Sequence, residues 1–213
     1  MKYYLFITVM PIVTIDGNIG CGKSSILNHL HKMYKIPIDL EPVESWNNYL
    51  TKMYDDKIDV FKFQVRVWLD RCWIQERNDK SVILMERSPL FIQSVFIETA
   101  YSLNMISQNE YTILQDLHLK TNDLWTCNIY IYLRSTPENC FKRLKKRNRP
   151  SEKNITQEYI QILHDKHEDV YTKASEKNMN IIVIDVDDKT IAEIGNEVLQ
   201  YVKHNFSNTK YVI

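Results

Sequence analysis

The chain of 213 residues is long enough for one domain with a well-buried core, and its 44% hydrophobic and 25% charged residues are an ordinary globular composition. Lys plus Arg and Asp plus Glu both number 27, so the formal net charge is zero. The chain therefore lacks the basic excess typical of proteins that bind long nucleic acids, whereas a small phosphorylated ligand needs positive charge only locally.

The N-terminal segment has some features of a targeting signal. Tyr3 to Val13 is largely apolar and follows Lys2, but it contains Pro11 and lacks a small-residue cleavage site. It is also too short to span a bilayer. We therefore expect an N-terminal tail that leads into the first core strand, in a soluble cytoplasmic protein without a membrane partner.

The cysteines indicate a reducing compartment. They are scattered along the chain without metal-ligand spacing, and a domain of this size seldom depends on disulfides. We therefore expect four free thiols, at Cys21, Cys72, Cys127 and Cys140.

Short apolar runs alternate with longer stretches of helical periodicity along the whole chain. The apolar runs predict strands buried on both faces at Ile12–Ile15, Ile36–Leu40, Val82–Met85, Ile129–Leu133 and Ile181–Ile184. The periodic stretches predict helices at Ser24–Tyr34, Asp59–Asn78, Leu90–Leu103, Gln108–Leu124, Pro137–Arg147, Thr156–Lys177 and Ile191–Asn205. This alternation predicts one α/β domain over residues 1–213, with a five-stranded parallel sheet and helices on both faces. Ligands of such folds bind at the carboxyl ends of the strands.

The first predicted strand leads into a glycine-rich motif. Residues 17–24 read GNIGCGKS, which fits the P-loop pattern G-x-x-x-x-G-K-[ST], and a predicted helix opens at Ser24. The backbone N–H groups of such a loop point at phosphate oxygens, and the helix N-terminus adds partial positive charge. Lys23 would reach the β- and γ-phosphates and Ser24 would ligate Mg²⁺, so we expect ATP and Mg²⁺ as cofactors. The expected phosphate-binding residues are Gly17, Asn18, Ile19, Gly20, Cys21, Gly22, Lys23, Ser24 and Ser25.

The phosphoryl acceptor has to be inferred from residues beyond the P-loop, because ATPases, GTPases, nucleotide kinases and nucleoside kinases share that motif. A hydroxyl acceptor benefits from a general base, whereas a phosphate acceptor is already anionic and needs arginines. Glu41 follows the second predicted strand, where Pro42 keeps it extended, and Glu86 and Arg87 follow the third. Taken singly, these could also be a solvated loop acid and a surface ion pair.

Five cationic residues lie within the seven positions 143–149. Such a run could be a solvated helix end. In a P-loop kinase it is also the expected lid, here about residues 143–153, which closes over the phosphates, excludes water and neutralises charge in the transition state.

Together these motifs resemble the deoxynucleoside kinase family, which includes deoxycytidine, deoxyguanosine and mitochondrial thymidine kinases and the insect multisubstrate enzyme. The motifs are I-D-G-N-I-G-C-G-K-S, E-P-V-E-x-W, F-Q, M-E-R-S and R-L-K-K-R-N-R-x-x-E, in this order, and they cover nearly the whole chain from about Ile12. The resemblance implies a P-loop kinase that phosphorylates a deoxynucleoside at its 5′-hydroxyl with ATP. It also implies a homodimer, for which Asp59–Asn78 and Leu90–Leu103 are candidate interface helices.

The resemblance further implies roles for single residues. Glu41 matches the general base, Arg87 the arginine beside that base and the transferring phosphoryl group, and Glu86 the acid near Mg²⁺, with Lys23 as the P-loop lysine. The implied sugar and base contacts are Tyr54 and Glu152 at the 3′-hydroxyl, Gln64 at the base edge, Phe96 stacked on the base, and Trp46 and Ile19 as pocket walls. The implied ATP contacts are Arg143, Arg147 and Arg149 in the lid, and Asp185, Val186 and Asp187 beside the adenine.

The sequence departs from the family pattern near the base. Arg71 lies two helical turns after Gln64, where deoxycytidine and deoxyguanosine kinases carry an arginine paired with an aspartate. Ile92 stands at the position of that aspartate, followed by Gln93, so Arg71 lacks its expected partner. Because Gln64 can pair with the edge of a pyrimidine, the sequence weakly favours pyrimidine deoxynucleosides, and Ile92 in place of the aspartate puts thymidine slightly ahead. It offers no account of Pro89 in the M-E-R-S-P version of the motif.

Two other functions remain open from the sequence. A nucleoside monophosphate kinase such as thymidylate kinase shares the P-loop and lid, but it would not need Glu41 as a base or the F-Q pair. A regulatory protein could also bind ATP without transferring phosphate.

Overall fold

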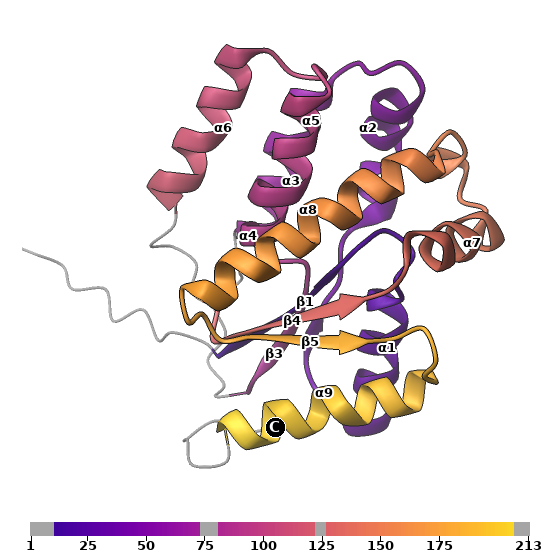
Figure 1. The fold of residues 1–213 in the computed structure, drawn as a ribbon, viewed down its shortest axis with the longest axis vertical. Coiled ribbons are helices and arrows are strands. Elements are labelled where there is room, and N and C mark those ends of the chain that lie inside the picture. Colours follow the sequence, from indigo (N-terminus) through magenta and orange to yellow (C-terminus); the bar gives the residue numbers. More distant parts are fainter. Residues whose placement is uncertain (1–10, 73–80, 122–126, 207–213) are drawn as a thin grey trace, which may run out of the picture.

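Five parallel strands form the central sheet of the computed structural model, which describes residues 11–72, 81–121 and 127–206 (Figure 1). Their order across the sheet is β2-β3-β1-β4-β5. All five lie within two residues of their predicted bounds, so the predicted parallel sheet is confirmed. The strands are β1 (Ile12–Gly17), β2 (Ile38–Asp39), β3 (Ile83–Glu86), β4 (Ile129–Arg134) and β5 (Ile181–Asp185).

The two edge strands differ from the prediction. Every residue of the inner strands β1 and β3 is buried, whereas β2 and most of β5 are half-buried. The prediction of strands buried on both faces is therefore wrong for the edges, because an edge strand has a neighbour on one side alone. In β2 the parallel pairing is limited to Ile38 and Asp39, which lie opposite Leu84 and Met85 of β3.

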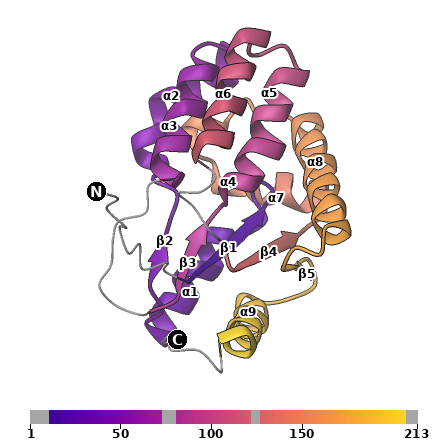
Figure 2. The ribbon, with the colours of Figure 1, turned by 90° about the vertical axis from the view of Figure 1, so that its left-hand side faces the viewer.

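Helices pack on both faces of the sheet (Figures 1 and 2). On one face, α1 (Lys23–Tyr34) packs against α9 (Ile191–Phe206) over alternate residues of β4 such as Ile131. On the other face, α8 (Gln157–Glu176) packs with the π-helical turn η1 (Ile92–Ile97) over Tyr132. The period of two along β4 thus assigns its side chains to two separate cores.

A second group of helices stands side by side above the sheet in Figure 2. It contains α2 (Val43–Asp55), α3 (Val60–Cys72), α5 (Glu98–Ser102) and α6 (Gln108–Thr121). Their apolar faces form a core of their own, which also receives Ile92 and Ile97 from η1. In the described part of the two candidate interface helices most apolar residues are packed within the chain, apart from exposed ones such as Leu69, and the homodimer stays a prediction.

Helix α2 is absent from the sequence-based prediction, which assigned no element between Leu40 and Asp59. Its apolar side chains Trp46, Leu50 and Met53 are buried and recur at intervals of four and three residues, as on one face of a helix. This spacing was present in the sequence and was overlooked. The remaining helical elements are α4 (Pro89–Phe91), α7 (Pro137–Arg147) and the 3₁₀ turn η3 (Pro150–Glu152).

Pro89 has a clear structural role. It is the first residue of α4, and the Ser88 hydroxyl before it accepts a hydrogen bond from the Phe91 N–H, as an N-cap does. Proline suits this position because its fixed φ is helical and its missing N–H would have no helical partner. The predicted helix Leu90–Leu103 is realised as α4, η1 and α5 in succession.

Several predictions fall partly outside the described residues. These are the N-terminal tail up to residue 10, the end of the predicted helix Asp59–Asn78 after Cys72, and residues 122–124 of the predicted helix Gln108–Leu124. The four cysteines are free thiols. Within the described ranges, no helix has the length and apolar character needed to cross a membrane.

Candidate active site

The P-loop lies between β1 and α1, as predicted, and its backbone conformation requires glycine. Gly20 and Gly22 have φ angles of 85° and 106°. A Cβ atom on Gly20 would lie 2.3 Å from the carbonyl oxygen of Cys140 in α7, so a side chain there would force the two segments apart. The loop can therefore curl tightly in front of α1, with backbone N–H groups at the helix N-terminus.

Lys23 is held within this loop. Its side chain is buried, and Nζ donates to the carbonyl oxygens of Gly17 and Asn18 at 3.1 Å each. Asn18 is anchored in turn, because its side-chain N–H₂ donates to the Ile160 carbonyl of α8 at 2.9 Å. The cation therefore lies at the centre of the phosphate loop before any anion arrives.

Glu86 connects three parts of the site. The Ser24 hydroxyl donates to Oε1 of Glu86 at 2.7 Å, and Oε2 accepts from the backbone N–H of Glu41 at 3.2 Å. A hydroxyl beside a carboxylate is an oxygen donor set of the kind that Mg²⁺ prefers when it also retains water and phosphate ligands. These two residues therefore fit the expected metal, although a cluster of three or more acidic, His or Cys ligands is not found among the described residues.

Glu41 and Arg87 form a short ion pair. Arg87 Nε lies 2.5 Å from Glu41 Oε1, and both side chains are largely buried. Burial alone would raise the pKa of Glu41, but the charges of Arg87, Lys23 and Arg71 outweigh it and hold the pKa below its ordinary value. Glu41 is therefore a carboxylate at neutral pH, which is the form that can accept a proton.

Arg87 adopts an unusual backbone conformation, with φ at 66°. Asp16, which the sequence-based reasoning missed, supports this turn: its Oδ1 accepts from the Ser88 N–H at 2.7 Å and from the Ser88 hydroxyl at 3.1 Å. Burial raises the pKa of Asp16, although these hydrogen bonds act in the opposite direction. The one available signal was an acidic residue at the end of a strand that should be wholly buried.

A cavity of about 180 Å³ opens between the P-loop and the helices α2, α3 and η1. It brings together most of the predicted residues, which come from elements and loops along the whole described chain. It also contains apolar residues that the sequence-based reasoning did not single out, namely Val43, Leu50, Met53, Phe63 and Val67. The sequence signal for these residues was the helical spacing of apolar residues in α2 and the apolar face of α3. The predicted residues that line it are Ile19, Gly20, Gly22, Lys23, Ser24, Ser25, Glu41, Trp46, Tyr54, Gln64, Glu86, Arg87, Ile92, Phe96, Arg147, Arg149 and Glu152.

One end of the cavity is apolar with a single amide. Gln64 is buried in α3 and lines the cavity, instead of lying on a solvated helix face. Phe96 of η1 lies under the Arg87 guanidinium, with 4.2 Å between the Arg87 Cζ and the ring centroid. Trp46 is fixed by a hydrogen bond of 2.7 Å from its indole N–H to Asp70. A flat ring with polar edges would fit between these groups.

Glu152 connects the cationic run to the cavity. Arg147 donates to Glu152 Oε2 at 2.6 Å through Nη2, and Arg149 lies 3.4 Å from Oε1. Tyr54 is near this group, and burial, with the charges of Tyr159 and Glu152, raises its pKa well above the ordinary value. The Tyr54 phenol therefore stays neutral and can donate a hydrogen bond.

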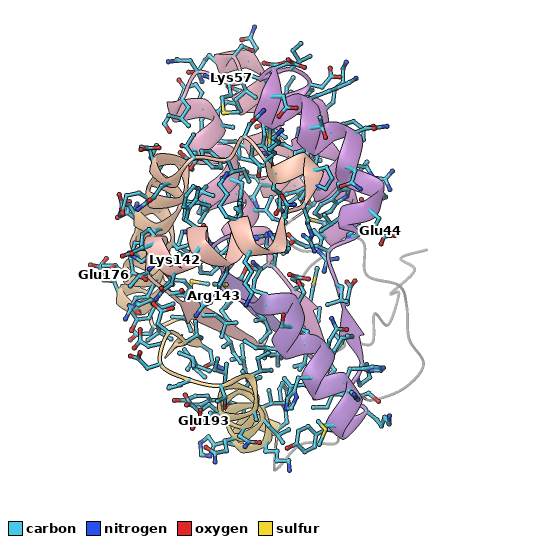
Figure 3. The ribbon with its side chains drawn as sticks, turned by 90° about the vertical axis from the view of Figure 1, so that its right-hand side faces the viewer. Glu44, Lys57, Lys142, Arg143, Glu176 and Glu193 are labelled. Atoms are coloured by element: carbon cyan, nitrogen blue, oxygen red, sulfur yellow. The ribbon has the colours of Figure 1, made fainter. Side chains whose placement is uncertain are left out.

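Four predicted ATP contacts lie elsewhere. Arg143 lies on α7 (Figure 3) and pairs with Asp187 at 3.2 Å. Asp185 and Asp187 border a separate hollow of about 300 Å³ beside the ends of β4 and β5, and Val186 is buried in the core. Asp187 caps this corner, since its carboxylate accepts from the Ser135 hydroxyl and the Thr136 N–H. The structure therefore does not bring these four to the cavity wall.

Arg71 is also absent from the cavity wall. Its guanidinium is directed toward the end of β2, where Nη2 lies 3.0 Å from Asp39 Oδ2. Asp39 is thus a partner other than the one that the family pattern led us to expect.

Comparison with known proteins agrees with this geometry. A profile of the deoxynucleoside kinase family matches residues 13–207. The chain is 31% identical to mitochondrial thymidine kinase 2 of Homo sapiens, over 77% of this chain and 65% of that protein, and 28% identical to mitochondrial deoxyguanosine kinase of Xenopus laevis, over 90% and 88%. The structure of deoxyadenosine kinase from M. mycoides with the products dCMP and dCDP superposes with a TM-score of 0.77 at 27% identity, covering 91% of this chain and 98% of that one. With a profile match over nearly its whole length, the chain belongs to the deoxynucleoside kinase family and has that family's ATP-dependent phosphotransferase fold.

Proposed function

We propose that this kinase phosphorylates the 5′-hydroxyl of a deoxynucleoside bound in the cavity, with Glu41 as the general base. The observation that carries the proposal is the position of the Glu41 carboxylate. It lines the same cavity as Lys23 and Ser24 of the P-loop, and it is ionised and held by Arg87. A hydroxyl acceptor needs such a base within reach as its oxygen attacks phosphorus, whereas an anionic phosphate acceptor does not.

The nucleoside would lie with its base at the apolar end of the cavity and its sugar toward Glu152. Gln64 would read the base edge through its amide, and Phe96 and Trp46 would contact the ring faces. Neutral Tyr54 would donate to the 3′-hydroxyl, and Glu152 would accept from it. This orientation directs the 5′-carbon toward Glu41 and the P-loop.

The triphosphate of ATP would occupy the P-loop. The backbone N–H groups and Lys23 would bind its β- and γ-phosphates, and Ser24 and Glu86 would hold Mg²⁺, which neutralises phosphate charge when bound. Arg87 would neutralise charge on the transferring group while keeping Glu41 in place. We propose that Arg147 and Arg149, as parts of a lid, supply further charge and exclude water. Asp185, Val186, Asp187 and Arg143 would border the adenine.

We propose that pyrimidine deoxynucleosides are the preferred substrates, with thymidine ahead. Ile92 and Val67 give this end of the cavity an apolar wall, and Arg71 is turned away toward Asp39. The 5-methyl group of thymine is apolar and suits such a wall, while the Gln64 amide can pair with a pyrimidine edge.

The acceptor is tested with purified protein, ATP and Mg²⁺, offered either dT, dC, dA and dG or the corresponding monophosphates. We expect ADP release and a new monophosphate with at least one deoxynucleoside. Turnover with monophosphates alone would show a nucleoside monophosphate kinase, and ATP binding without ADP release in either series would show a nucleotide-binding protein without transfer.

A further inference from the structure

Arg71 makes an unusually complete set of contacts with the end of β2. It lies near the end of α3, and its side chain is only 1% exposed. Nη1 donates to Asp39 Oδ1 and to the Leu40 carbonyl oxygen, each at 3.2 Å. Nη2 donates to Asp39 Oδ2 at 3.0 Å and to the Asp39 carbonyl oxygen at 3.4 Å. One guanidinium therefore binds a carboxylate and two successive backbone carbonyls.

The segment that Arg71 holds leads directly into Glu41. β2 is an edge strand of two residues that ends at Asp39, so the sheet no longer fixes the chain at Leu40. Pro42, on the other side of Glu41, has no N–H to donate. The Glu41 backbone is therefore held by the Arg71 fork on one side, by its own N–H bond to Glu86, and by the Val43 N–H, which donates to the Glu41 carbonyl oxygen at 2.9 Å.

The geometry points to Arg71 as a positioning residue, which, together with Asp39, holds the Glu41 turn in the place where its carboxylate meets Arg87. The inference deepens the proposed function, since it rests on Glu41 as the base. A planar guanidinium suits this task because its donors are rigidly arranged and bind two groups at once. A shift of about 1 Å in a catalytic group can cost 10²-fold in rate, so loss of the fork should slow turnover.

The alternative is that Arg71 reads the nucleobase. To do so it would have to leave Asp39, which would leave the buried Arg71 guanidinium without its carboxylate partner. Ile92, which lines the cavity, offers it no carboxylate there. The Nε of Arg71 is buried without a hydrogen-bond partner among the described residues. A hydrogen bond from this Nε to the nucleobase is therefore the alternative that the experiment has to distinguish.

The kinetic constants provide a readout that separates positioning from base reading and from general stability. A positioning residue acts on the transition state, so its loss should lower kcat per folded molecule and leave KM nearly unchanged. A residue that reads the base would change KM unequally for the four substrates, and a loss of folded protein would leave kcat per folded molecule unchanged.

The test compares Arg71→Met, Asp39→Asn and the double variant with the parent, using all four deoxynucleosides and ATP. Arg66→Met is the matched control, because Arg66 lies on the same helix in an exposed ion pair with Asp70. We expect kcat per folded molecule, normalised by circular dichroism, to fall about 10- to 100-fold in both single variants. The fall should be equal for the four substrates, with little change in KM and no further loss in the double variant.

Three results would overturn the inference: a changed ranking of the four bases in Arg71→Met, additive losses in the double variant, or parent-like kcat in either single variant. If Arg71→Met does not fold, Arg71→Lys and Asp39→Asn give the same comparison. Failure of the proposed function is a separate outcome, because it would appear as a parent enzyme without activity on any deoxynucleoside.

Discussion

The Ser24 hydroxyl and the Glu86 carboxylate lie 2.7 Å apart, which joins the start of α1 to the end of β3. These two oxygens approach each other at the edge of the phosphate loop, and in the proposed mechanism they would hold Mg²⁺, which would supply charge neutralisation. The hydrogen bond keeps both groups oriented for that ion. It also connects the P-loop to Glu86, the residue that precedes Arg87.

Removal of either oxygen should weaken metal use. Glu86→Gln and Ser24→Ala are expected to raise the Mg²⁺ concentration for half-maximal activity by about 10- to 100-fold. Ser24→Thr is the control, since the P-loop pattern accepts either hydroxyl. Titration of activity against Mg²⁺ at saturating ATP measures the effect, and equal titration midpoints in all four proteins would contradict the metal assignment.

Pyrimidine deoxynucleosides should be the best substrates, with thymidine slightly ahead, because the apolar wall at Ile92 suits the thymine methyl group and Gln64 offers its amide. Competition among the four deoxynucleosides at equal concentration measures the ranking as kcat/KM. A purine that wins by tenfold or more would contradict this preference and would favour a direct role of Arg71 at the base.

The lid is tested by Arg147→Ala and Arg149→Ala. Each should lower kcat far more than it weakens deoxynucleoside binding, because the positive charge matters most in the transition state. The loss of one such donor typically costs about 3–4 kcal/mol. Lys142→Ala is the control, since Lys142 is exposed on α7 and pairs with Glu138 (Figure 3). Unchanged turnover in both arginine variants would mean that the cationic residues 143–149 form a solvated helix end and not a lid.

His167 should make the stability of the protein depend on pH. It is fully buried beside Phe91, Phe96 and Tyr132, and its Nε2 has no hydrogen-bond partner within the described ranges. Burial, together with the charge of Arg87, holds the pKa of His167 well below its ordinary value.

The unfolded chain therefore binds a proton near pH 6.5 that the folded chain does not, so the free energy of unfolding should fall as the pH drops below that value. His167→Phe keeps an aromatic ring but cannot bind the proton. Urea unfolding at pH 7.5 and 5.5 should show a smaller drop for the variant than for the parent. Equal drops would mean that His167 is protonated in the folded protein as well.

The parts of the site that sequence reasoning located are those with local signatures. The P-loop, Glu41 and Arg87 follow predicted strands, and the carboxyl ends of parallel strands meet at one edge of the sheet. The Asp39–Arg71 contact has no such signature, because it joins residues 32 positions apart from an edge strand and a helix. Tertiary packing alone determines that Arg71 turns toward Asp39.

The departures in the fold have the same origin. Helix α2 carries only three buried residues at helical spacing, and the core that receives them is built from helices distant in the sequence. The π-helical turn η1 places Ile92 and Phe96 in the cavity wall, although its sequence reads as part of one continuous helix. A π-helical turn of this kind depends on what the helix packs against. The spacing of apolar residues in the sequence carries no information about that packing.

The last prediction concerns Glu41, whose assignment as a base separates a hydroxyl acceptor from other P-loop chemistry. Glu41→Gln keeps the size and the hydrogen-bonding reach toward Arg87 but removes basicity, so folding and ATP binding should survive. Loss of a general base typically lowers the rate by about 10²–10⁴-fold, and this loss should appear in kcat with a modest change in KM. Glu44→Gln is the matched control, because Glu44 is exposed three residues further along, in the first turn of α2 (Figure 3).

The direction of the pH effect on turnover follows from the lowered pKa of Glu41. Because Arg87, Lys23 and Arg71 hold the pKa of Glu41 below the ordinary 4.5, the active carboxylate is present above that value and is lost only as the pH falls through the lowered pKa. The parent should therefore lose turnover through Glu41 only below about pH 4.5, provided that it stays folded, and Glu41→Gln should lack that limb. A Glu41→Gln enzyme within a few-fold of the parent at pH 7.5 would refute the base, since an amide cannot accept the 5′-hydroxyl proton that the carboxylate takes.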